Sequence, residues 1–459
     1  MRDGMTSEAE GGIDAIQGRA RAVGAAIADG DLTAAVGFVT GMPAPDLADV
    51  IELLTPEARV RLIEAQGTTF DFEVLSELDP SVRDQLTEAL PNELLARAVN
   101  ALDSDDAAYV IEHLDADDRR EILSQLPTVD RAALERNLDY PEETAGRLMQ
   151  AEFVAVAPYW TVGYLIDTMR EAAPDALPQT FTEFFVVDPS FKVLGAVDIS
   201  RLLRTKRHVK IEEIMNRDRT VVLATADQTE VARQFRRYDL MSAPVVDANQ
   251  RLVGVVTVDD VVEVIDEEAE HEMKALGGVG DERLSDSLRQ IAPNRFSWLF
   301  VNLLTAILAS AVIKVFDATI EHMVALAVLM PIVASMGGNA GTQTMTVAVR
   351  ALATGELGAA NVVRVVVRET AVGLFNGVMF ATLMAVVVLL YYGSGKLGGV
   401  IAGAMIINML AAALAGIFVP LALDRYGFDP AVSSTVFVTT VTDVVGFFAF
   451  LGLASLWLM

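Results

Sequence analysis

The chain of 459 residues contains no cysteine and only four histidines. Disulfide bonds and thiolate metal sites are therefore excluded. The sequence also lacks a nucleophile–base pair or a metal-hydrolase spacing, so we do not expect an enzyme. The first twelve residues are polar and acidic without a hydrophobic run. We therefore expect no signal peptide and an N-terminal part that stays in the cytoplasm.

Excess acidic charge is absent from the C-terminal part of the chain. After residue 294 there are seven acidic and seven basic residues, so the whole net charge of −28 lies in the first 294 residues. An acidic surface repels nucleic acid and attracts cations, which argues against a nucleic-acid partner. For most of these carboxylates solubility is a sufficient explanation. The sequence predicts an acidic soluble part followed by a neutral, hydrophobic part.

Helix start signals recur in the first 138 residues. Four of them follow a leucine, at spacings of 24, 24 and 12 residues: Thr55, Asp79, Asp103 and Asp115. Thr and Asp are favoured N-cap residues, and proline at the first helical position follows two of them. The pattern predicts stacked short helices in a superhelix.

Residues 139–262 alternate predicted strands and helices, and the pattern occurs twice. The apolar run 184–188 is answered by 243–247, and 194–197 by 253–256, each 59 residues later. This repeat resembles a tandem pair of CBS domains, which are regulatory modules that often bind adenine nucleotides.

An acidic helix is predicted next, within a connecting segment over residues 263–294. Residues 259–276 carry eight carboxylates and no proline or glycine. Most such runs are solvated helix faces. Here the helix joins the repeat to the hydrophobic part, and packed like charges would repel unless cations bridged them, so a switch is the alternative.

Five hydrophobic runs in residues 295–459 are long enough to cross a bilayer. They cover about 296–316, 323–349, 370–392, 397–423 and 432–459. The loop 350–369 carries three arginines, whereas the loops expected on the opposite side carry one lysine. The positive-inside rule then predicts a multi-pass protein of the cell membrane with a cytoplasmic N-terminus and an external C-terminus.

The last run carries one charged residue, Asp443, near its middle. A carboxylate at bilayer depth is costly and usually faces a bundle interior on an ion or substrate path. Steps of four, three and four residues place a polar stripe beside it: Thr435, Thr439, Thr442 and Gly446.

The second run contains a polar, glycine-rich stretch at residues 335–343, after Pro331. Such a stretch exposes backbone carbonyls and is tolerated at depth only beside protein or a water-filled path. Close helix packing through small residues is the alternative. Carboxylate, carbonyl, hydroxyl and amide oxygens suit Mg²⁺, Ca²⁺ or Mn²⁺. Because Mg²⁺ keeps several waters, one Asp443 per subunit, paired across a dimer axis, would meet the requirement.

Five motifs accompany this order of parts. They are YPEETAGRLM at 140–149, VVTVDDV at 255–261, GGNAGTQ at 337–343, RALAT at 350–354 and TTVTD at 439–443. Together they resemble the MgtE family of magnesium channels over nearly the whole chain. The predicted fold is a multidomain membrane protein. Its parts are an all-α acidic N-terminal superhelix (1–138), an α/β tandem CBS pair (139–262), an acidic connecting or plug helix (263–294) and a transmembrane pore domain of five helices (295–459).

The resemblance implies a homodimer with a pore on its two-fold axis, lined by the second and fifth spans. Asp443 matches the pore carboxylate that holds a hydrated Mg²⁺. The matching pore-lining positions are Gly338, Asn339 and Thr439, and Ser335 is a further pore-lining position at which this chain replaces a glycine of the family. The resemblance also implies that cytosolic Mg²⁺ binds carboxylates of the soluble part and closes the pore. Matching sensing positions are Glu73, Asp105, Asp239, Asp260, Glu263, Glu268 and Glu272.

The chain departs from the family pattern at several positions. Tyr109 and His271 stand where the family often has carboxylates, and Thr435 replaces an asparagine near the pore entrance. Arg201 and Leu240 replace the aspartate and phenylalanine of nucleotide-binding members, which argues against ATP as a ligand of the CBS pair.

The predicted function is a magnesium-selective channel that takes up Mg²⁺ and is closed by cytosolic Mg²⁺. One alternative is a divalent cation carrier coupled to Na⁺ or H⁺ through Asp443. Another is a membrane sensor that reports ion or nucleotide levels without transport.

Overall fold

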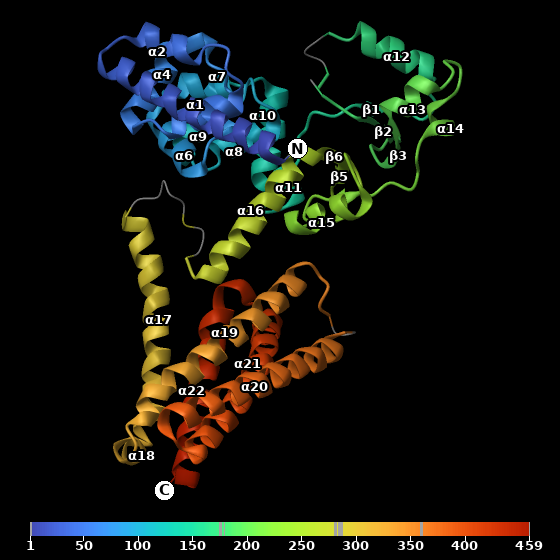
Figure 1. Cartoon of the computed structure of the whole chain (residues 1–459). Helices are drawn as coiled ribbons and strands as arrows, with labels where there is room; N and C mark the ends of the chain where they lie inside the picture. The colour runs from blue at the N-terminus through green and yellow to red at the C-terminus, as the bar shows by residue number, and fades with distance from the viewer. Residues whose placement is uncertain are drawn as a thin grey trace. The chain divides into compact units, whose positions relative to one another are not determined.

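The computed structural model describes residues 2–173, 177–178, 180–279, 282, 288–358 and 361–458. By its internal contacts the chain divides into two compact units, Met1–Glu268 and Ala269–Met459 (Figure 1).

Short helices build the first part of the first unit, as the start signals predict. Their bounds are α1 Arg2–Ala28, α2 Leu32–Val39, α3 Ala44–Glu52, α4 Pro56–Gln66, the 3₁₀ turn η1 Gly67–Thr69, α5 Val74–Glu77, α6 Pro80–Ala89, α7 Asn92–Val99, α8 Ser104–Ile111, α9 Ala116–Gln125 and α10 Thr128–Asp139. All four predicted starts are confirmed, because α4, α6, α8 and α9 begin directly after Thr55, Asp79, Asp103 and Asp115. Of these four residues, only Asp79 accepts a capping hydrogen bond, from the backbone N–H of Ser81 at 2.9 Å.

The predicted repeat forms two equivalent three-stranded sheets. The elements are α11 Ala145–Leu148, β1 Ala155–Val156, α12 Val162–Glu171, β2 Glu183–Val187, β3 Val193–Asp198, α13 Ile199–Arg204, α14 Ile211–Ile214, β4 Val222–Leu223, α15 Gln228–Tyr238, β5 Ser242–Val246 and β6 Leu252–Thr257. In each sheet the first strand is parallel to the second and the second antiparallel to the third. Phe184 pairs with Val197, and Ala243 pairs with Val256, so the 59-residue repeat holds at the level of strand register.

A buried ion pair joins the two sheets. The Glu183 carboxylate of β2 accepts hydrogen bonds from the guanidinium of Arg219 and the hydroxyl of Ser242 on β5. Glu183 and Ser242 are equivalent positions, since they lie 59 residues apart. Burial raises the pKa of Glu183, and the bonds from Ser242 and Arg219 partly oppose this shift. The pseudo-symmetry of the repeat therefore brings position 183 against position 242.

The second unit contains the long apolar helices. Its elements are α17 Leu288–Lys314, α18 Asp317–His322, α19 Ala325–Ala353, α20 Val362–Tyr392, α21 Gly395–Arg425 and α22 Pro430–Leu458, while α16 Val258–Gly277 crosses the boundary between the units. Five of these helices are long and apolar enough to cross a membrane, which agrees with the five predicted runs. The third begins at Val362 rather than near residue 370. Part of the predicted connecting segment, 280–281 and 283–287, lies outside the described residues.

The expectation that residues 335–343 expose backbone carbonyls is wrong. Helix α19 runs without a break from Ala325 to Ala353. Gly337 and Gly341 instead admit neighbouring helices: a Cβ on Gly341 would lie 2.6 Å from Cγ1 of Val438 on α22. The helix with the polar stretch therefore contacts the helix that carries Asp443.

We predict that Glu183→Ala lowers the free energy of unfolding by about 3–5 kcal/mol, because it leaves the Arg219 charge buried without its partner. Asp167→Ala is the matched control. It breaks the Asp167–Arg207 pair, whose side chains are 51% and 56% exposed, and should cost less than about 1 kcal/mol. The measurement is urea unfolding of the full chain, followed by Trp160 fluorescence with Trp298 and Trp457 changed to Phe. Equal losses in the two variants would show that the Glu183 pair does not hold the sheets together.

Candidate cation sites

Asp443 lies in the middle of α22 and is half-buried within a single chain. In the described part of the chain it has no hydrogen-bond or ion-pair partner. An unpaired carboxylate is expensive at bilayer depth, and such residues face a bundle interior or a water-filled cavity. The described residues of one chain therefore leave Asp443 without a counter-charge.

Helix α19 presents a polar face of the same kind. Ser335, Asn339 and Gln343, spaced four residues apart, are exposed in the single chain, whereas Gly337 and Gly341 between them are buried. Polar side chains rarely face lipid. This face therefore suits water or a second copy of the chain rather than acyl chains.

The predicted polar stripe of α22 divides into two parts. Thr435 and Thr439 are partly buried, and the Thr439 hydroxyl donates to the Thr435 carbonyl at 2.9 Å. Thr442 is fully buried, and Gly446 packs against Asn408 of α21. Thr442 and Gly446 are thus part of the packing inside the bundle, which corrects their placement on one stripe beside Asp443.

A second group of carboxylates lies in the first unit, around a cavity of about 270 Å³. Asp105 and Asp106, in the first turn of α8, line this cavity together with Asp260 and Glu263 of α16. We call these four residues the acidic cluster. It joins the helical N-terminal part to the helix that leaves the second sheet.

Burial raises the pKa of every member of the acidic cluster. The pKa of Asp106 rises to about 6 and that of Glu263 to about 7, chiefly by desolvation and then by neighbouring carboxylates. The pKa values of Asp105 and Asp260 rise for the same primary reason, and the charge of Asp260 raises the pKa of Asp105 further. Ionisation of these carboxylates therefore costs free energy, through desolvation and mutual repulsion, and a bound cation would offset this cost.

Two arginines lie close to the cluster, and Arg147 lines the same cavity. The Arg83 guanidinium is 1% exposed and lies 3.5 Å from the ring centroid of Tyr109, a position where a carboxylate was expected from the resemblance. Arg83 and Arg147 both pair with Glu112, at 3.9 and 3.4 Å. The protein thus neutralises Glu112 with its own arginines and leaves the four carboxylates of the cluster without a basic partner of this kind.

The seven predicted sensing carboxylates do not all gather at this cavity. Asp105, Asp260 and Glu263 line it, and Glu73 lies near enough to raise the pKa of Asp106. The other three lie elsewhere. Asp239 caps α15 in a left-handed conformation, Glu268 lies farther along α16, and Glu272 pairs with Arg350 at 2.6 Å.

Sequence reasoning missed Asp106, which is a full member of the cluster, and His271 has a partner that was not foreseen. The three consecutive polar residues at 104–106 mark a helix start, but this signal cannot show which of them faces α16. The His271 imidazole lies 3.3 Å from the Asp429 carboxylate, at the start of α22.

No three carboxylate or histidine side chains converge at metal-ligand distance within the ranges that the structure describes. Direct chelation by the protein alone is therefore not preformed. The oxygen-rich clusters fit an ion that keeps part of its water, which is the usual behaviour of Mg²⁺.

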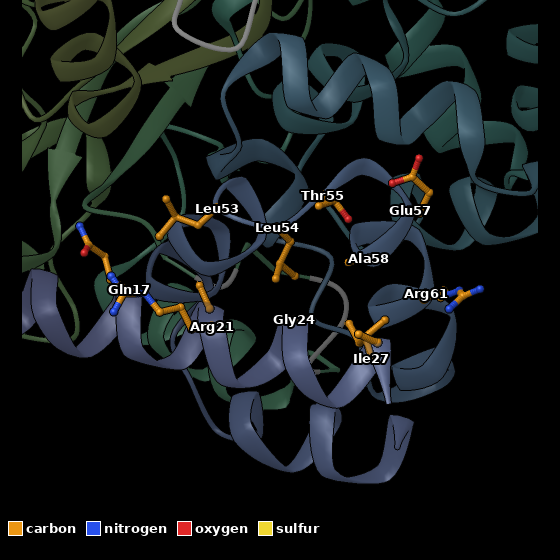
Figure 2. A pocket seen from close by; sticks show the side chains of 12 residues that line it. Gln17, Arg21, Gly24, Ile27, Leu53, Leu54, Thr55, Glu57, Ala58 and Arg61 are labelled. Atoms are coloured by element: carbon orange, nitrogen blue, oxygen red, sulfur yellow. The ribbon is translucent and has the colours of Figure 1, made fainter. Parts of the chain in front are cut away.

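A larger pocket, of about 620 Å³, lies between α1 and the α3–α4 corner (Figure 2). Its wall is mainly apolar, with Leu53, Leu54 and Ile27, and Arg21 and Arg61 lie at its edges. With basic residues at the edges and an apolar wall, it lacks the chemistry of a cation site.

Three family models match the chain. They describe a divalent cation transporter over residues 330–453, the MgtE intracellular N domain over 42–143 and a CBS domain over 211–267. The magnesium transporter MgtE of Thermus thermophilus is 36% identical over 333 residues, which is 72% of this chain and 73% of that protein. The chain belongs to the MgtE family. It is accordingly a multi-pass membrane transporter rather than an enzyme at the level of the family.

Two further proteins are similar to this chain. The magnesium transporter MgtE of Bacillus subtilis is 28% identical over 411 residues, which is 89% of this chain and 91% of that protein. A solved cytosolic domain of the Mg²⁺ channel MgtE in complex with ATP is 33% identical, with a TM-score of 0.48, and covers 53% of this chain and 99% of that one. The predicted acidic N-domain, CBS pair and five apolar helices are confirmed as the architecture of this family.

The raised pKa values predict that Mg²⁺ displaces protons from the acidic cluster. Near pH 6.5 Asp106 and Glu263 are partly protonated in the metal-free chain, whereas a bound cation requires ionised carboxylates. Asp260, with a pKa of about 7, is also partly protonated at this pH. We therefore expect roughly one to two protons released per chain at pH 6.5 and far fewer at pH 8.5, where Asp106, Glu263 and Asp260 are largely ionised. In the absence of metal, the packing of α8 against α16 should become more stable as the pH falls from about 8 to 5, because protonation removes the repulsion between their carboxylates.

The measurement is calorimetric titration of the full chain with Mg²⁺ in two buffers of different ionisation enthalpy. The Asp106→Asn/Glu263→Gln variant is the control and should lose the part of the pH-dependent release that these two groups supply, while the part from Asp260 remains. Proton release that is equal at both pH values in the parent chain would contradict the prediction.

Proposed function

We propose that the chain is a magnesium-selective channel that works as a homodimer, with its permeation path between two copies of α19 and α22. The observation that supports this is the unpaired Asp443 on a membrane helix in contact with the helix whose polar face is uncovered. A second copy related by a two-fold axis brings both polar faces together. Two Asp443 carboxylates then lie across one path.

The proposed ion is Mg²⁺ with its water. One carboxylate per protomer supplies two negative charges at the axis, and the polar side chains of Ser335, Asn339 and Thr439 are suited to hydrogen bonds with bound water. Mg²⁺ loses water reluctantly, so a site that binds the hydrated ion passes it faster than a site that strips it. A monovalent ion that has lost its water is stabilised less by such a site, because its charge is lower and no water layer contacts the polar side chains.

Closure by cytosolic Mg²⁺ is the proposed regulation. Asp105 and Asp106 belong to the helical part, whereas Asp260 and Glu263 belong to α16. Without a cation, the like charges of these carboxylates push the helical part and α16 apart. A bound cation removes this repulsion and holds α16 in one position. Since α16 leads towards the membrane helices, its position determines whether the path is open.

The proposed orientation has the first unit in the cytoplasm and the end of α22 outside. Mg²⁺ then enters down its electrochemical gradient and closes the path by binding the acidic cluster. For ATP we propose no role at the CBS pair: Leu240 is buried in the core and offers no aromatic ring, and Arg201 replaces an expected carboxylate.

We predict that Asp443→Ala lowers the Mg²⁺ current by roughly two orders of magnitude or more, since a hydrogen bond to a charged group contributes about 1.5–3 kcal/mol and the dimer loses two such sites. Asp443→Asn should keep the size of the side chain but reduce selectivity for divalent over monovalent ions. The measurement is patch recording at several external Mg²⁺ concentrations. A current that requires a Na⁺ or H⁺ gradient would favour the carrier, and no current in any condition would favour the sensor.

We predict that Asp260→Asn/Glu263→Gln/Glu268→Gln conducts normally when open but needs about tenfold more internal Mg²⁺ for half-closure, within the usual range of allosteric coupling. The matched control changes three exposed carboxylates of α10, in Asp130→Asn/Glu135→Gln/Asp139→Asn, and should close like the parent. Inside-out patches with stepped internal Mg²⁺ provide the measurement. If the two triple variants close at the same Mg²⁺ concentration, the acidic helix is not the switch.

A further inference from the structure

Asn408 is a buried amide in the middle of α21, which is the helix that packs against α19, α20 and α22. Its side chain is 1% exposed. The Nδ2 atom donates a hydrogen bond of 2.8 Å to the backbone carbonyl of Val333 on α19. Asn408 thus ties the central helix of the bundle to the helix with the uncovered polar face.

Two glycines form the space that this amide occupies. A Cβ on Gly337 of α19 would lie 2.1 Å from Nδ2 of Asn408, and a Cβ on Gly446 of α22 would lie 2.7 Å from the same atom. Any side chain at either position would displace the amide. One asparagine therefore fills a notch shared by both helices of the proposed path.

The notch lies next to the residues that matter for permeation. Gly337 immediately precedes Gly338 and Asn339, and Gly446 follows Asp443 by three residues, which is just under one helical turn. A shift of the amide therefore moves the two polar faces relative to each other.

The side-chain oxygen of Asn408, Oδ1, is buried and lacks a hydrogen-bond donor among the described residues. A buried acceptor without a partner is destabilising, and a leucine of similar size would fill the same notch without this cost. The amide at this position points to a donor that no described side chain supplies, and a water molecule buried between the helices is such a donor.

We propose that Asn408 is a positioning residue for the permeation site. Its amide fixes the spacing of α19 and α22 through the hydrogen bond to Val333 and the packing against Gly337 and Gly446. Its Oδ1 accepts a hydrogen bond from a water molecule buried between these helices. This inference rests on the proposed function, because it takes Asp443 as the permeation site. The hydrogen-bonding groups of the Asn408 amide, and not only the volume of its side chain, then influence ion selection.

The test compares Asn408→Leu with the parent in patch recordings. Leucine keeps the volume but loses the hydrogen bond to Val333 and the acceptor for water. We expect the Mg²⁺/Na⁺ permeability ratio to fall by about fivefold or more, the effect of one buried hydrogen bond, and the half-saturating Mg²⁺ concentration to rise, while dimer yield is unchanged. Asn376→Leu on α20 is the control and should leave both quantities as in the parent.

A second variant separates chemistry from packing. Gly446→Ala alone places a methyl group against Asn408 and should reduce assembly. Gly446→Ala/Asn408→Ala removes the clash and should restore assembly but not selectivity, because no amide remains. Parental selectivity in this double variant, or in Asn408→Leu, would overturn the proposal, and the double variant decides the matter if the leucine variant does not assemble.

Asp443→Ala is measured in parallel so that the two failures can be told apart. If Asp443→Ala conducts like the parent, the proposed permeation site is wrong. If Asp443→Ala loses its current while Asn408→Leu keeps parental selectivity and half-saturation, only the role of Asn408 is wrong.

Discussion

The cost of holding a carboxylate away from bulk water without a fixed counter-charge governs this structure. At Glu183 the protein offsets that cost with its own groups, because Arg219 and Ser242 donate hydrogen bonds to the carboxylate at the junction of the two sheets. At Asp443 it does not, since no described side chain pairs with this residue. A carboxylate of the first kind has its counter-charge built into the fold, and we propose that one of the second kind is matched by a cation from solution.

The acidic cluster follows the same rule in the soluble part. Arg83 and Arg147 neutralise Glu112 next to the cavity, whereas burial and neighbouring charge raise the pKa values of Asp106 and Glu263 to about 6 and 7. The chain thus keeps two places where negative charge is left for a cation, one on a membrane helix and one at the base of α16. In the proposed function the same ion serves both places, which gives negative feedback.

Patterns that depend on period or composition predicted the fold correctly. The helix starts after Thr55 and Asp79, the 59-residue repeat and the five apolar helices follow from local chemistry and hydropathy. The errors concern which neighbour a residue meets. Thr442 matched the period of a polar face but is buried inside the bundle, and Gly337 and Gly341 serve helix packing within an unbroken α19. An asparagine within an apolar helix predicts an interhelical hydrogen bond, and Asn408 makes one, but only the structure shows that its partner is Val333 and that two glycines make room for it.

The most direct test of the central claim is a high-resolution map of the assembled protein in a lipid bilayer with Mg²⁺ present. The account predicts density for a cation between two Asp443 carboxylates, separated from each by a layer of water. An Asp443 side chain that faces acyl chains, or that pairs with a basic residue with no water-filled route beside it, would contradict the account.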